Sequence, residues 1–429
     1  MSIGVGIIGL GTVGSGTVEI LEQRIPYFAS QLGLDIEIRG LCAKSEEETA
    51  PFAARGHRTT TNADELIADP SIQILVELVG GYEMPRRWIS AALRAGKHVV
   101  TANKALIAKH GAELFPIAAE KGVCLQFEAA VGGGIPVIRA MQESLQGCEV
   151  REIRGIVNGT CNYILTRMFQ QDEDFETVLA DAQKLGYAEA NPTFDVDAID
   201  SAHKLAILAS LASGKFVDFG KILVEGIRGI GREDVRMARE MGCTVKLLGI
   251  YRRCDDGRID ARVHPCLLPK DHLLSRVDGV LNAVHIEATN LGPTLMTGAG
   301  AGKLPTASAV VGDIVSIARR IASGRVLPLP MGFYNADNAA DLLPAGEMRN
   351  KYYLRLSTRD RAGVLAAVAQ CFKAHDISVA TLIQKPAKDD AASIIFTTHR
   401  CLESDVQAAI AELDALPESL APAKMIRFG

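Results

Sequence analysis

The sequence lacks the features that would indicate a nucleic-acid-binding, membrane or secreted protein. Its 429 residues carry a formal net charge of −5, and no run of Lys and Arg interleaved with aromatic residues occurs, which argues against nucleic acid as a partner. No apolar stretch approaches the ~18 residues that a membrane span requires. The apolar amino terminus has no basic segment of the kind found in signal peptides. We therefore expect a soluble, cytoplasmic protein.

The cysteines form neither a disulfide framework nor a zinc pattern. The nine cysteines are odd in number, scattered and never spaced as C-x-x-C; they lie at positions 42, 124, 148, 161, 243, 254, 266, 371 and 401. We expect them to be reduced and mostly buried thiols.

A glycine-rich turn near the amino terminus predicts a dinucleotide site. A short apolar strand is followed by Gly9-x-Gly11-x-x-Gly14 and then by an amphipathic helix. In that context the first two glycines permit a tight turn and close approach of a pyrophosphate, and the third lets helix and strand pack. The helix N-terminus then faces the phosphates. The alternative is a glycine-rich turn without a ligand, which the flanking strand and helix disfavour.

Strand-like and helical segments alternate after this turn. The strand-like runs are DIEIRGLCA, IQILVELVG, KHVVTA and VCLQFEA, and PRRWISAALRAG is one of the helical stretches between them. Such alternation is typical of a Rossmann-type, doubly wound parallel sheet. A length of 429 residues predicts two or three domains at about 150 residues each, and we assign residues 1–135 to the first.

Three positions at the strand ends of this domain are candidate ligand contacts. No carboxylate directly follows the second strand, and Lys44 there could meet a 2′-phosphate, which favours NADP(H) while leaving NAD(H) possible. The alternative is that Lys44 is a solvated loop residue. Lys104 follows the fourth strand and would reach the nicotinamide end. The loop from Glu128 to Pro136, with three consecutive glycines, suits either a hard cation held by main-chain oxygens or the passage into a second domain. The residues alone favour the passage.

Residues 136–302 predict a second, α+β domain for substrate binding and oligomerisation. Strand-like segments at CEVREIRGIVNG, TVKLLGIYRR, RIDARVHPCLL and AVHIEATN indicate a mixed sheet with helices on one face. A glycine-rich turn, Gly298 to Gly302, precedes an apolar helix at 303–325 that we expect to return to the first domain and close the cofactor site. The alternative is a simple loop between domains.

The carboxyl-terminal part predicts a separate module. Residues 326–349 have the composition of a linker. Residues 350–429 then follow the order strand, helix, strand, strand, helix, strand, which is the ferredoxin-like arrangement.

The stretch GYAEANPTFDVDAIDSAHK, residues 186–204, contains the candidate catalytic groups. We expect one helix to begin between Asp195 and Asp197, which would place Asp197, Asp200 and Lys204 on one stripe before the helix becomes apolar. With Glu189, these groups could hold a small zwitterion and move a proton. The alternative is a surface ion pair between Asp200 and Lys204, worth about 0.3–0.5 kcal/mol.

Several long motifs together resemble one family over almost the whole chain. GLGTVG, TANKA at 101–105, EAAVGGGIPVI at 128–138, NGTCNYI at 158–164, GYAEANPTFDVDAIDSAHK and GAGAGKLPTASAVVGDI occur in this order in monofunctional bacterial homoserine dehydrogenases. The last eighty residues resemble an ACT domain, with Asp360 to Leu365 at its D-x-P-G-V-L motif. Ala362 replaces the usual proline there, and Ala299 replaces a proline in the glycine-rich turn. Neither position carries a reactive group.

The resemblance implies the reversible reduction of L-aspartate 4-semialdehyde to L-homoserine by NAD(P)H, in threonine, methionine and isoleucine biosynthesis. It implies that Lys204 donates a proton, that Lys104 polarises the same oxygen, and that Glu189, Asp200 and Asp195 bind the amino acid. The cofactor would contact Gly9, Leu10, Gly11, Thr12, Val13, Gly14, Lys44, Lys104, Gly186 and Gly302. A sodium ion would be held by Glu128, Val131, Gly133 and Ile135, mainly through backbone oxygens.

The resemblance also implies a homodimer or homotetramer and L-threonine as the effector of the ACT domain. Because the dinucleotide fold begins at the first residues, we expect no aspartokinase segment ahead of it. Two other classes remain possible. One is a different NAD(P)-dependent amino-acid oxidoreductase, which would have no reason to combine Glu189, Asp200 and Lys204. The other is a non-catalytic amino-acid sensor, against which the presence of both Lys104 and Lys204 argues.

Overall fold

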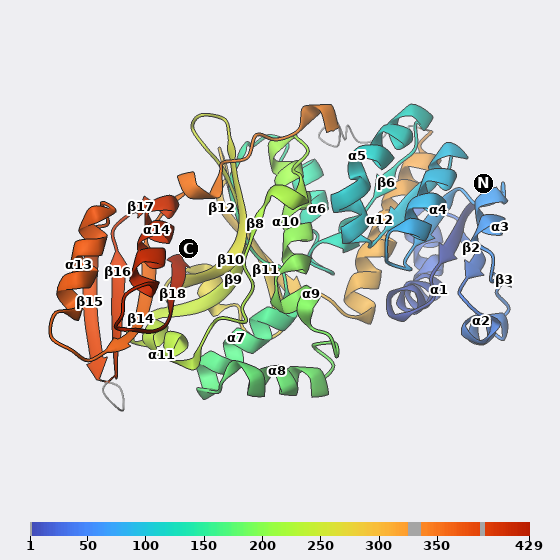
Figure 1. Ribbon diagram of the computed structural model, residues 1–429. Coiled ribbons are helices and arrows are strands. Elements are labelled where there is room, and N and C mark those ends of the chain that lie inside the picture. Colours follow the sequence, from blue (N-terminus) through green and yellow to red (C-terminus); the bar gives the residue numbers. More distant parts are fainter. Residues whose placement is uncertain (1, 325–335, 387–390) are drawn as a thin grey trace.

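The computed structural model describes residues 2–324, 336–386 and 391–429, which form three parts arranged in a row (Figure 1). The amino-terminal part lies at the right of Figure 1, the carboxyl-terminal part at the left, and a mixed sheet with its helices between them. No helix of the described residues is both long and apolar enough to cross a membrane.

The first part is built on a parallel sheet of six strands. Their order across the sheet is β3 (Thr59–Thr60), β2 (Ile36–Cys42), β1 (Ile3–Ile8), β4 (Ile74–Glu77), β5 (His98–Thr101) and β6 (Leu125–Gln126). This is the strand order of a Rossmann fold, so the prediction of a doubly wound sheet is confirmed. The short strand β3 was not predicted from the sequence.

Helices follow the strands of this sheet, as the alternation predicted. They are α1 (Thr12–Leu32), α2 (Glu46–Ala53), α3 (Ala63–Ala68), α4 (Glu83–Arg94) and α5 (Lys104–Lys121). Helix α12 (Lys303–Ala322) returns from the second part and packs against α1. A Cβ atom at Gly16 of α1 would lie 2.9 Å from the Lys303 backbone oxygen, so only glycine permits this approach.

The mixed sheet of the second part continues into the carboxyl-terminal part. Its order is β12 (Gly292–Ala299), β11 (Leu281–Ala288), β7 (Val150–Ile156), β9 (Cys243–Arg253), β10 (Ile259–Pro269), β18 (Ser419–Phe428), β14 (Tyr352–Arg359), β16 (Ala391–Thr398) and β15 (Val379–Pro386), with β8 (Leu223–Val224) paired to β10. Strand β12 takes up Gly298 and Ala299, so the predicted glycine-rich turn is shorter than expected. The strand forms because each of its residues pairs with β11.

The carboxyl-terminal part has the predicted order of a ferredoxin-like module. Helices α13 (Val364–Ala374) and α14 (Glu403–Asp414) alternate with β14, β15, β16 and β18, and they enclose a separate hydrophobic core with β14, β16 and β18. A two-stranded ladder, β13 (Arg349–Asn350) with β17 (Cys401–Leu402), lies beside them. The last strand, β18, pairs in parallel with β10 of the second part, through Cys266 with Arg427. The module therefore shares one sheet with the second part.

The predicted linker, residues 326–349, lies partly outside the described residues. Its described portion, 336–349, contains two short 3₁₀ turns (Ala336–Asn338 and Ala345–Glu347) and is bound along the second part. Backbone hydrogen bonds join Ile259 to Asp341 at 2.9 Å and Ala340 to Phe216 at 2.7 Å. This portion is thus attached to the second part and is not a free spacer.

The remaining helices belong to the second part, where some pack on its strands and others on neighbouring helices. They are α6 (Val137–Arg139) with the π-helical turn Ala140–Ser144, α7 (Gly159–Gln171), α8 (Phe175–Lys184), α9 (Thr193–Val196), α10 (Ile199–Ser213) and α11 (Arg232–Glu240). Helix α10 crosses β9 at Gly249, where a Cβ atom would lie 3.5 Å from that of Leu205. Further short turns are Glu128–Ala130, Phe219–Lys221 and Leu273–Arg276.

The prediction of a single helix that begins between Asp195 and Asp197 is wrong. Two helices occupy this stretch, α9 and α10, because Ala198 adopts the left-handed conformation with φ of 65° and ends the first of them. A non-glycine residue in this conformation costs about 1–2 kcal/mol, so the surrounding packing must impose it. Ala198 is fully buried, which is consistent with such a constraint.

Candidate active site

Helix α10 carries a buried lysine and a buried aspartate at its start. The Lys204 ammonium lies 2.7 Å from Asp200 Oδ2 and donates a second hydrogen bond of 2.7 Å to the backbone oxygen of Val157. The side chains of Lys204 and Asp200 are only 11% and 5% exposed. The alternative of a surface ion pair is therefore excluded, because neither group is solvated.

A second lysine reaches the same carboxylate from the parallel sheet. Lys104 is the first residue of α5, whose N-terminus is fixed by the Asn103 side chain accepting a hydrogen bond from the Leu106 backbone. The Lys104 ammonium lies 3.0 Å from Asp200 Oδ1. Asp200 thus lies between two lysines, each bound to one of its oxygens.

Asn158 connects Asp200 to a second carboxylate, and the sequence reasoning did not identify it. Its side-chain nitrogen donates to Asp200 Oδ2 at 2.9 Å and to Asp195 Oδ1 at 2.8 Å. Its side-chain oxygen accepts from the Cys161 backbone at 2.8 Å and so caps α7. The cap fixes the amide orientation, because the oxygen must face the helix and the nitrogen must face the carboxylates. An Asn preceding a helix was the available signal.

Two other acids lie apart from this cluster. Asp197 was expected on the stripe with Asp200 and Lys204, but it follows α9 and pairs with Arg228 at 2.6 Å on the surface. It does not belong to the site, because the break at Ala198 turns it away. Glu189 is exposed, and its charge contributes to raising the pKa of Lys104.

The four charged groups shift one another's protonation. Burial lowers the pKa of Lys204, and the nearby Lys104 ammonium acts in the same direction against the attraction of Asp200. Burial opposes ionisation of Asp200, but the two lysines outweigh it and hold the pKa of this carboxyl below its usual range. Burial raises the pKa of Asp195. Burial also opposes ionisation of Lys104, but the attraction of Asp200 outweighs it and raises the pKa of Lys104. Lys204 is consequently the more acidic of the two ammonium groups.

The glycine-rich turn has the geometry of a phosphate cradle. A Cβ atom at Gly14 would lie 1.9 Å from the Gly9 oxygen, and one at Gly9, where φ is 96°, would lie 2.8 Å from Leu78. A Cβ atom at Gly11 would meet no protein atom within 4 Å. Two of the glycines are thus required by the protein itself, whereas the space beside Gly11 at the N-terminus of α1 is open to a ligand. Leu10, Thr12 and Val13 belong to the same turn and first helical residues.

A comparison with known protein families decides the assignment. Profiles described as "Homoserine dehydrogenase", "Homoserine dehydrogenase, NAD binding domain" and "ACT domain" match residues 136–315, 9–128 and 352–418. The chain belongs to the homoserine dehydrogenase family. It is therefore an oxidoreductase that consists of a nicotinamide-cofactor domain, a catalytic domain and an ACT domain.

Individual members of the family are similar over their full length. The homoserine dehydrogenase of Pseudomonas aeruginosa is 43% identical over 429 residues, covering 99% of this chain and 98% of the relative. That of Neisseria gonorrhoeae is 41% identical over 432 residues, with coverage of 99% and 98%. The crystal structure of a homoserine dehydrogenase from Thiobacillus denitrificans has a TM-score of 0.94 at 43% identity and covers 100% of this chain and 98% of that one.

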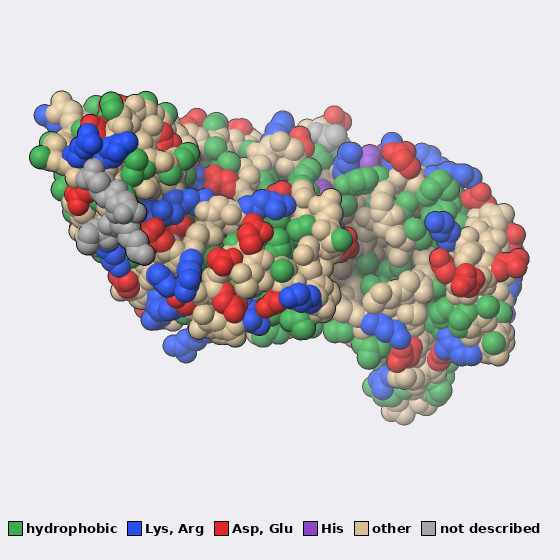
Figure 2. All heavy atoms as spheres, turned by 60° about the horizontal axis from the view of Figure 1, so that its bottom comes forward, with side chains coloured by type: hydrophobic (Ala, Val, Ile, Leu, Met, Phe, Trp, Pro, Cys, Tyr) green, Lys and Arg blue, Asp and Glu red, His purple; other side chains and the backbone are tan. Residues whose placement is uncertain are grey.

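A further family structure contains a cofactor. A hyperthermophilic archaeal homoserine dehydrogenase in complex with NADPH has a TM-score of 0.63 at 28% identity, covering 74% of this chain and 98% of that one. In the present chain, Lys104 belongs to the same part as the glycine-rich turn, whereas Lys204 belongs to the second part. Figure 2 shows the surface hollowed between the amino-terminal part, at the right, and the middle part.

A buried glutamate at the carboxyl edge of the parallel sheet orders the loop before α4, and it too was missed by the sequence reasoning. The Glu77 carboxylate accepts hydrogen bonds from the Val79 backbone at 2.7 Å and from the Thr101 hydroxyl at 2.8 Å. Asn103 donates to the Gly81 oxygen at 2.7 Å, which ties this loop to the start of α5. An acid ending an otherwise apolar strand was the signal. Burial raises the pKa of Glu77.

The remaining cofactor candidates lie on loops. Lys44 is exposed directly after β2, and its backbone nitrogen lies 3.3 Å from a carboxylate oxygen of Glu48 in the first turn of α2. An acid therefore folds back to this strand end although none directly follows it in sequence. Gly302 precedes α12 with φ of 123°, and Gly186 is an exposed residue with φ of 75°.

The loop proposed for a cation is buried and electronegative. Both Glu128 carboxylate oxygens accept backbone hydrogen bonds of 2.8 Å, from Ile138 and Arg139, so the side chain is already occupied. Burial and the neighbouring Asp313 raise the pKa of Glu128 to about 7. Gly133 has φ of 57°, and a Cβ atom there would lie 2.5 Å from the Gly300 backbone. Asp313 in turn pairs with Arg139 at 2.8 Å, so the acids beside the loop from Val131 to Ile135 already have one cationic partner.

Proposed function

We propose that this chain catalyses the reversible, NAD(P)H-dependent reduction of L-aspartate 4-semialdehyde to L-homoserine. The observation that carries the proposal is the buried cluster in which Asp200 binds both Lys104 and Lys204. Such a cluster offers two ammonium groups to one developing negative charge, and the family relationship supplies the substrate. Neither a different amino-acid oxidoreductase nor a sensor explains two lysines held on one buried carboxylate.

The bound cofactor would supply a hydride to the aldehyde carbon. The aldehyde oxygen gains negative charge as this occurs, and Lys204 donates its proton to that oxygen. Its pKa, lowered by burial, suits a proton donor. Lys104 stabilises the same charge electrostatically and keeps its proton. Asp200 holds both ammonium groups in position, while Glu189 and Asp195 bind the amino group of the substrate.

The activity is tested by following NADPH oxidation in the presence of L-aspartate 4-semialdehyde. We expect turnover that depends on both compounds and reverses with L-homoserine and NADP⁺. Turnover with other amino-acid semialdehydes but not with this one would contradict the substrate assignment, and cofactor binding without any turnover would favour a sensor.

We propose that NADP(H) is used at least as well as NAD(H), through Lys44. Lys44 is exposed at the end of β2 and free to reach a 2′-phosphate, whereas the nearby Glu48 could accept hydrogen bonds from ribose hydroxyls. The two side chains together support acceptance of both cofactors. The remaining cofactor contacts proposed from the family are Gly9, Leu10, Gly11, Thr12, Val13, Gly14, Gly186 and Gly302.

We propose that a sodium ion binds the Glu128, Val131, Gly133 and Ile135 loop through main-chain oxygens. The support is the burial of two acids beside this loop: burial raises the pKa of Glu128 to about 7 and that of Asp313 to about 6, although Asp313 pairs with Arg139. Thermal unfolding in sodium chloride and in choline chloride at equal ionic strength tests this. Equal unfolding temperatures in the two salts would contradict it.

We propose L-threonine as the effector of the ACT domain, acting on a homodimer or homotetramer. Because β18 pairs with β10, removal of the whole module would expose the edge of the catalytic sheet, so a truncated chain is a poor test. The better variant is Asp360→Ala, in the loop that precedes α13. Threonine inhibition unchanged by this variant would place the inhibitor elsewhere, and sedimentation at several concentrations determines the assembly.

We propose domains at 1–135 with 303–325, at 136–302 and at 350–429, which limited proteolysis would test. A cytoplasmic location would be tested by cell fractionation.

A further inference from the structure

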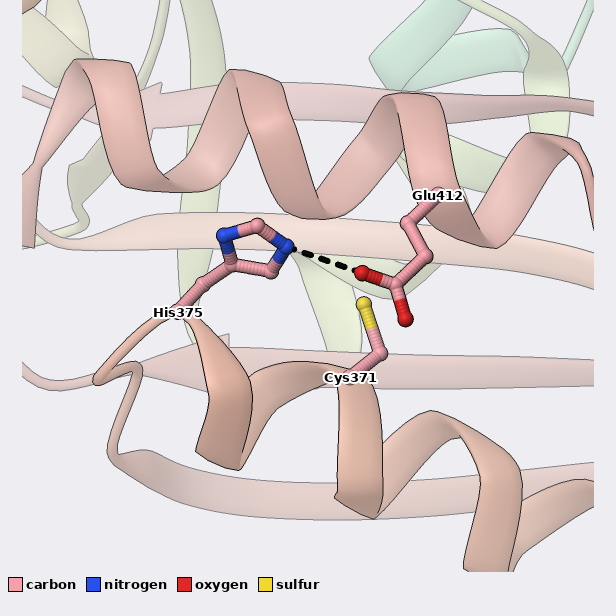
Figure 3. A group of neighbouring side chains, drawn as sticks. All are labelled: Cys371, His375 and Glu412. Carbon is pink, nitrogen blue, oxygen red and sulfur yellow. Dashed lines mark hydrogen bonds and ion pairs between the residues drawn. The ribbon is translucent and has the colours of Figure 1, made fainter.

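Three side chains with metal-ligand chemistry meet between the two helices of the ACT domain. Cys371 lies on α13, His375 directly follows that helix, and Glu412 lies on α14 (Figure 3). One ligand atom from each, the sulfur, a ring nitrogen and a carboxylate oxygen, lies within 4.8 Å of the other two. Among the described residues, this is the one group of at least three His, Cys, Asp or Glu side chains with such spacing.

The spacing is close to that of a tetrahedral metal site. Zinc bonds of about 2.0–2.3 Å place the ligand atoms of a tetrahedral site about 3.3–3.7 Å apart. His375 Nε2 and Glu412 Oε2 are already 3.0 Å apart, and no pair exceeds 4.8 Å. A closure of about 1 Å by side-chain rotation would complete the arrangement. Cys371 and His375 are four residues apart, the spacing that puts two side chains on one face of a helix.

Stability alone gives little reason for the three groups to converge. The His375–Glu412 pair is 25% and 51% exposed, and an exposed pair contributes about 1 kcal/mol or less. The thiol of Cys371 lies 3.5 Å from the Ala409 oxygen and interacts with the Glu412 carboxylate. Burial is the main cause, and the negative charge of Glu412 the second, that raises the pKa of this thiol to about 11. Without a cation, Glu412 therefore disfavours the thiolate form of Cys371. A divalent cation would reverse this relationship by attracting both.

We propose that Cys371, His375 and Glu412 bind one divalent transition-metal ion of the zinc class, with water in the fourth position. A mixed sulfur, nitrogen and oxygen set suits a borderline-soft ion and not calcium or magnesium. The exposed side of His375 and Glu412 leaves room for the water. The ion would tie α13 to α14 and would bind with release of the thiol proton, so its affinity should rise with pH.

The test uses the full chain without an affinity tag, stripped of metal and titrated with Co²⁺ as a spectroscopic probe. We expect one equivalent of Co²⁺ per chain, with the visible bands of tetrahedral cobalt and a near-ultraviolet thiolate-to-cobalt band. Cys371→Ser should abolish the thiolate band, and His375→Gln or Glu412→Gln should weaken binding at least about tenfold. Zn²⁺ should displace the Co²⁺.

Cys254→Ser is the matched control, because Cys254 is a partly buried thiol outside the ACT domain. It should leave the titration unchanged. If Cys371→Ser fails to fold, the His375→Gln and Glu412→Gln variants still test the proposal, because both positions are partly exposed and the substitutions should not prevent folding. A thiolate band that survives in His375→Gln and Glu412→Gln, or is lost in Cys254→Ser, or fails to appear in the unaltered chain, would overturn the proposal.

Discussion

The ammonium of Lys104 lies 3.0 Å from a carboxylate oxygen of Asp200, and this contact joins two separately built parts of the chain. Lys104 begins α5 and is positioned by the parallel sheet, whereas Asp200 lies on α10 and is positioned by the mixed sheet. The distance between Lys104 and Lys204 therefore depends on how the two parts are packed together. Substitutions that disturb this packing should slow the reaction without touching the reacting atoms.

Lys204→Met should lower kcat by about 100-fold to 10,000-fold, the range for a positioned acid or base. Cofactor affinity should barely change, because Lys204 is bound to Asp200 and Val157 and not to the glycine-rich turn. Lys104→Met should slow the reaction and also weaken NADPH binding. Steady-state kinetics and fluorescence titration of NADPH measure both effects.

Lys184→Met is the control for these lysine variants. Lys184 is 77% exposed and pairs with Asp181 on α8, so its kinetics should match those of the unaltered chain. Near-normal turnover by Lys204→Met would end the assignment of Lys204 as proton donor.

The pH dependence should reveal the protonation state of Lys204. In the reduction direction Lys204 must be protonated, so kcat should fall as pH rises through a pKa below the ordinary lysine value of about 10.4, since burial lowers it. In the oxidation of homoserine it must be neutral, so kcat should rise over the same interval. Asp200→Asn removes the carboxylate that favours the ammonium form and should move both limbs to lower pH. A limb that persists in Lys204→Met belongs to another group.

Asn158 should have a role in catalysis that is separate from its role as a helix cap. Asn158→Ser keeps a capping oxygen for α7 but removes the amide that bridges Asp195 and Asp200. We expect a loss in kcat/KM of about tenfold or more, as for loss of a supporting hydrogen bond, with little change in unfolding temperature. Asn158→Asp should be worse kinetically, because a third carboxylate would face the other two.

Asn191 provides a control for this substitution, because it lies on an exposed loop near α9 and caps no residue of the cluster. Asn191→Ser should leave kcat/KM unchanged. Equal losses of stability in Asn158→Ser and Asn158→Ala, with normal kinetics in both, would reduce Asn158 to a structural cap.

Cofactor selection should depend on two side chains at the end of β2. Lys44→Ala should lower kcat/KM for NADPH more than for NADH, since a cationic partner of the 2′-phosphate is lost. Glu48→Gln should affect NADH more, if this carboxylate accepts hydrogen bonds from the ribose. Measuring kcat/KM for NADPH and for NADH with each variant tests both expectations. A strong preference for NADH that Lys44→Ala leaves unchanged would contradict the first expectation.

The joint between the ACT domain and the catalytic sheet should depend on Arg427. Its side chain is 1% exposed and binds Glu225 of the second part at 2.7 Å and Glu403 of α14 at 2.5 Å. Arg427→Met leaves the buried Glu403 without its cation and should reduce the free energy of unfolding by about 3–5 kcal/mol. Arg400→Met, at an exposed position, is the control. In the double variant Arg427→Met/Glu403→Gln, part of the loss should be recovered.

Local patterns in the sequence determined much of the fold. The glycines at 9, 11 and 14 predicted the turn before α1, because the requirement for glycine there arises from contacts within a few residues of the chain and with one neighbouring strand. Alternating apolar strands and helices predicted the parallel sheet, and the ferredoxin-like order of the last eighty residues was equally local. The family motifs then named Lys104 and Lys204 and their partner Asp200.

Interactions between distant residues determined the rest. The pairing of Cys266 with Arg427 merges two sheets that the sequence separated by a linker. Ala198 ends α9 because buried packing holds it at φ of 65°, and this break removes Asp197 from the site. Asn158 bridges Asp195 and Asp200 only because α7, α9 and α10 meet. Cysteine spacing gave no hint of the group formed by Cys371, His375 and Glu412, since its third member lies on another helix. The hydrophobic periodicity of a sequence indicates which face of a helix or strand is buried. Which residues pack against that face depends on the tertiary structure.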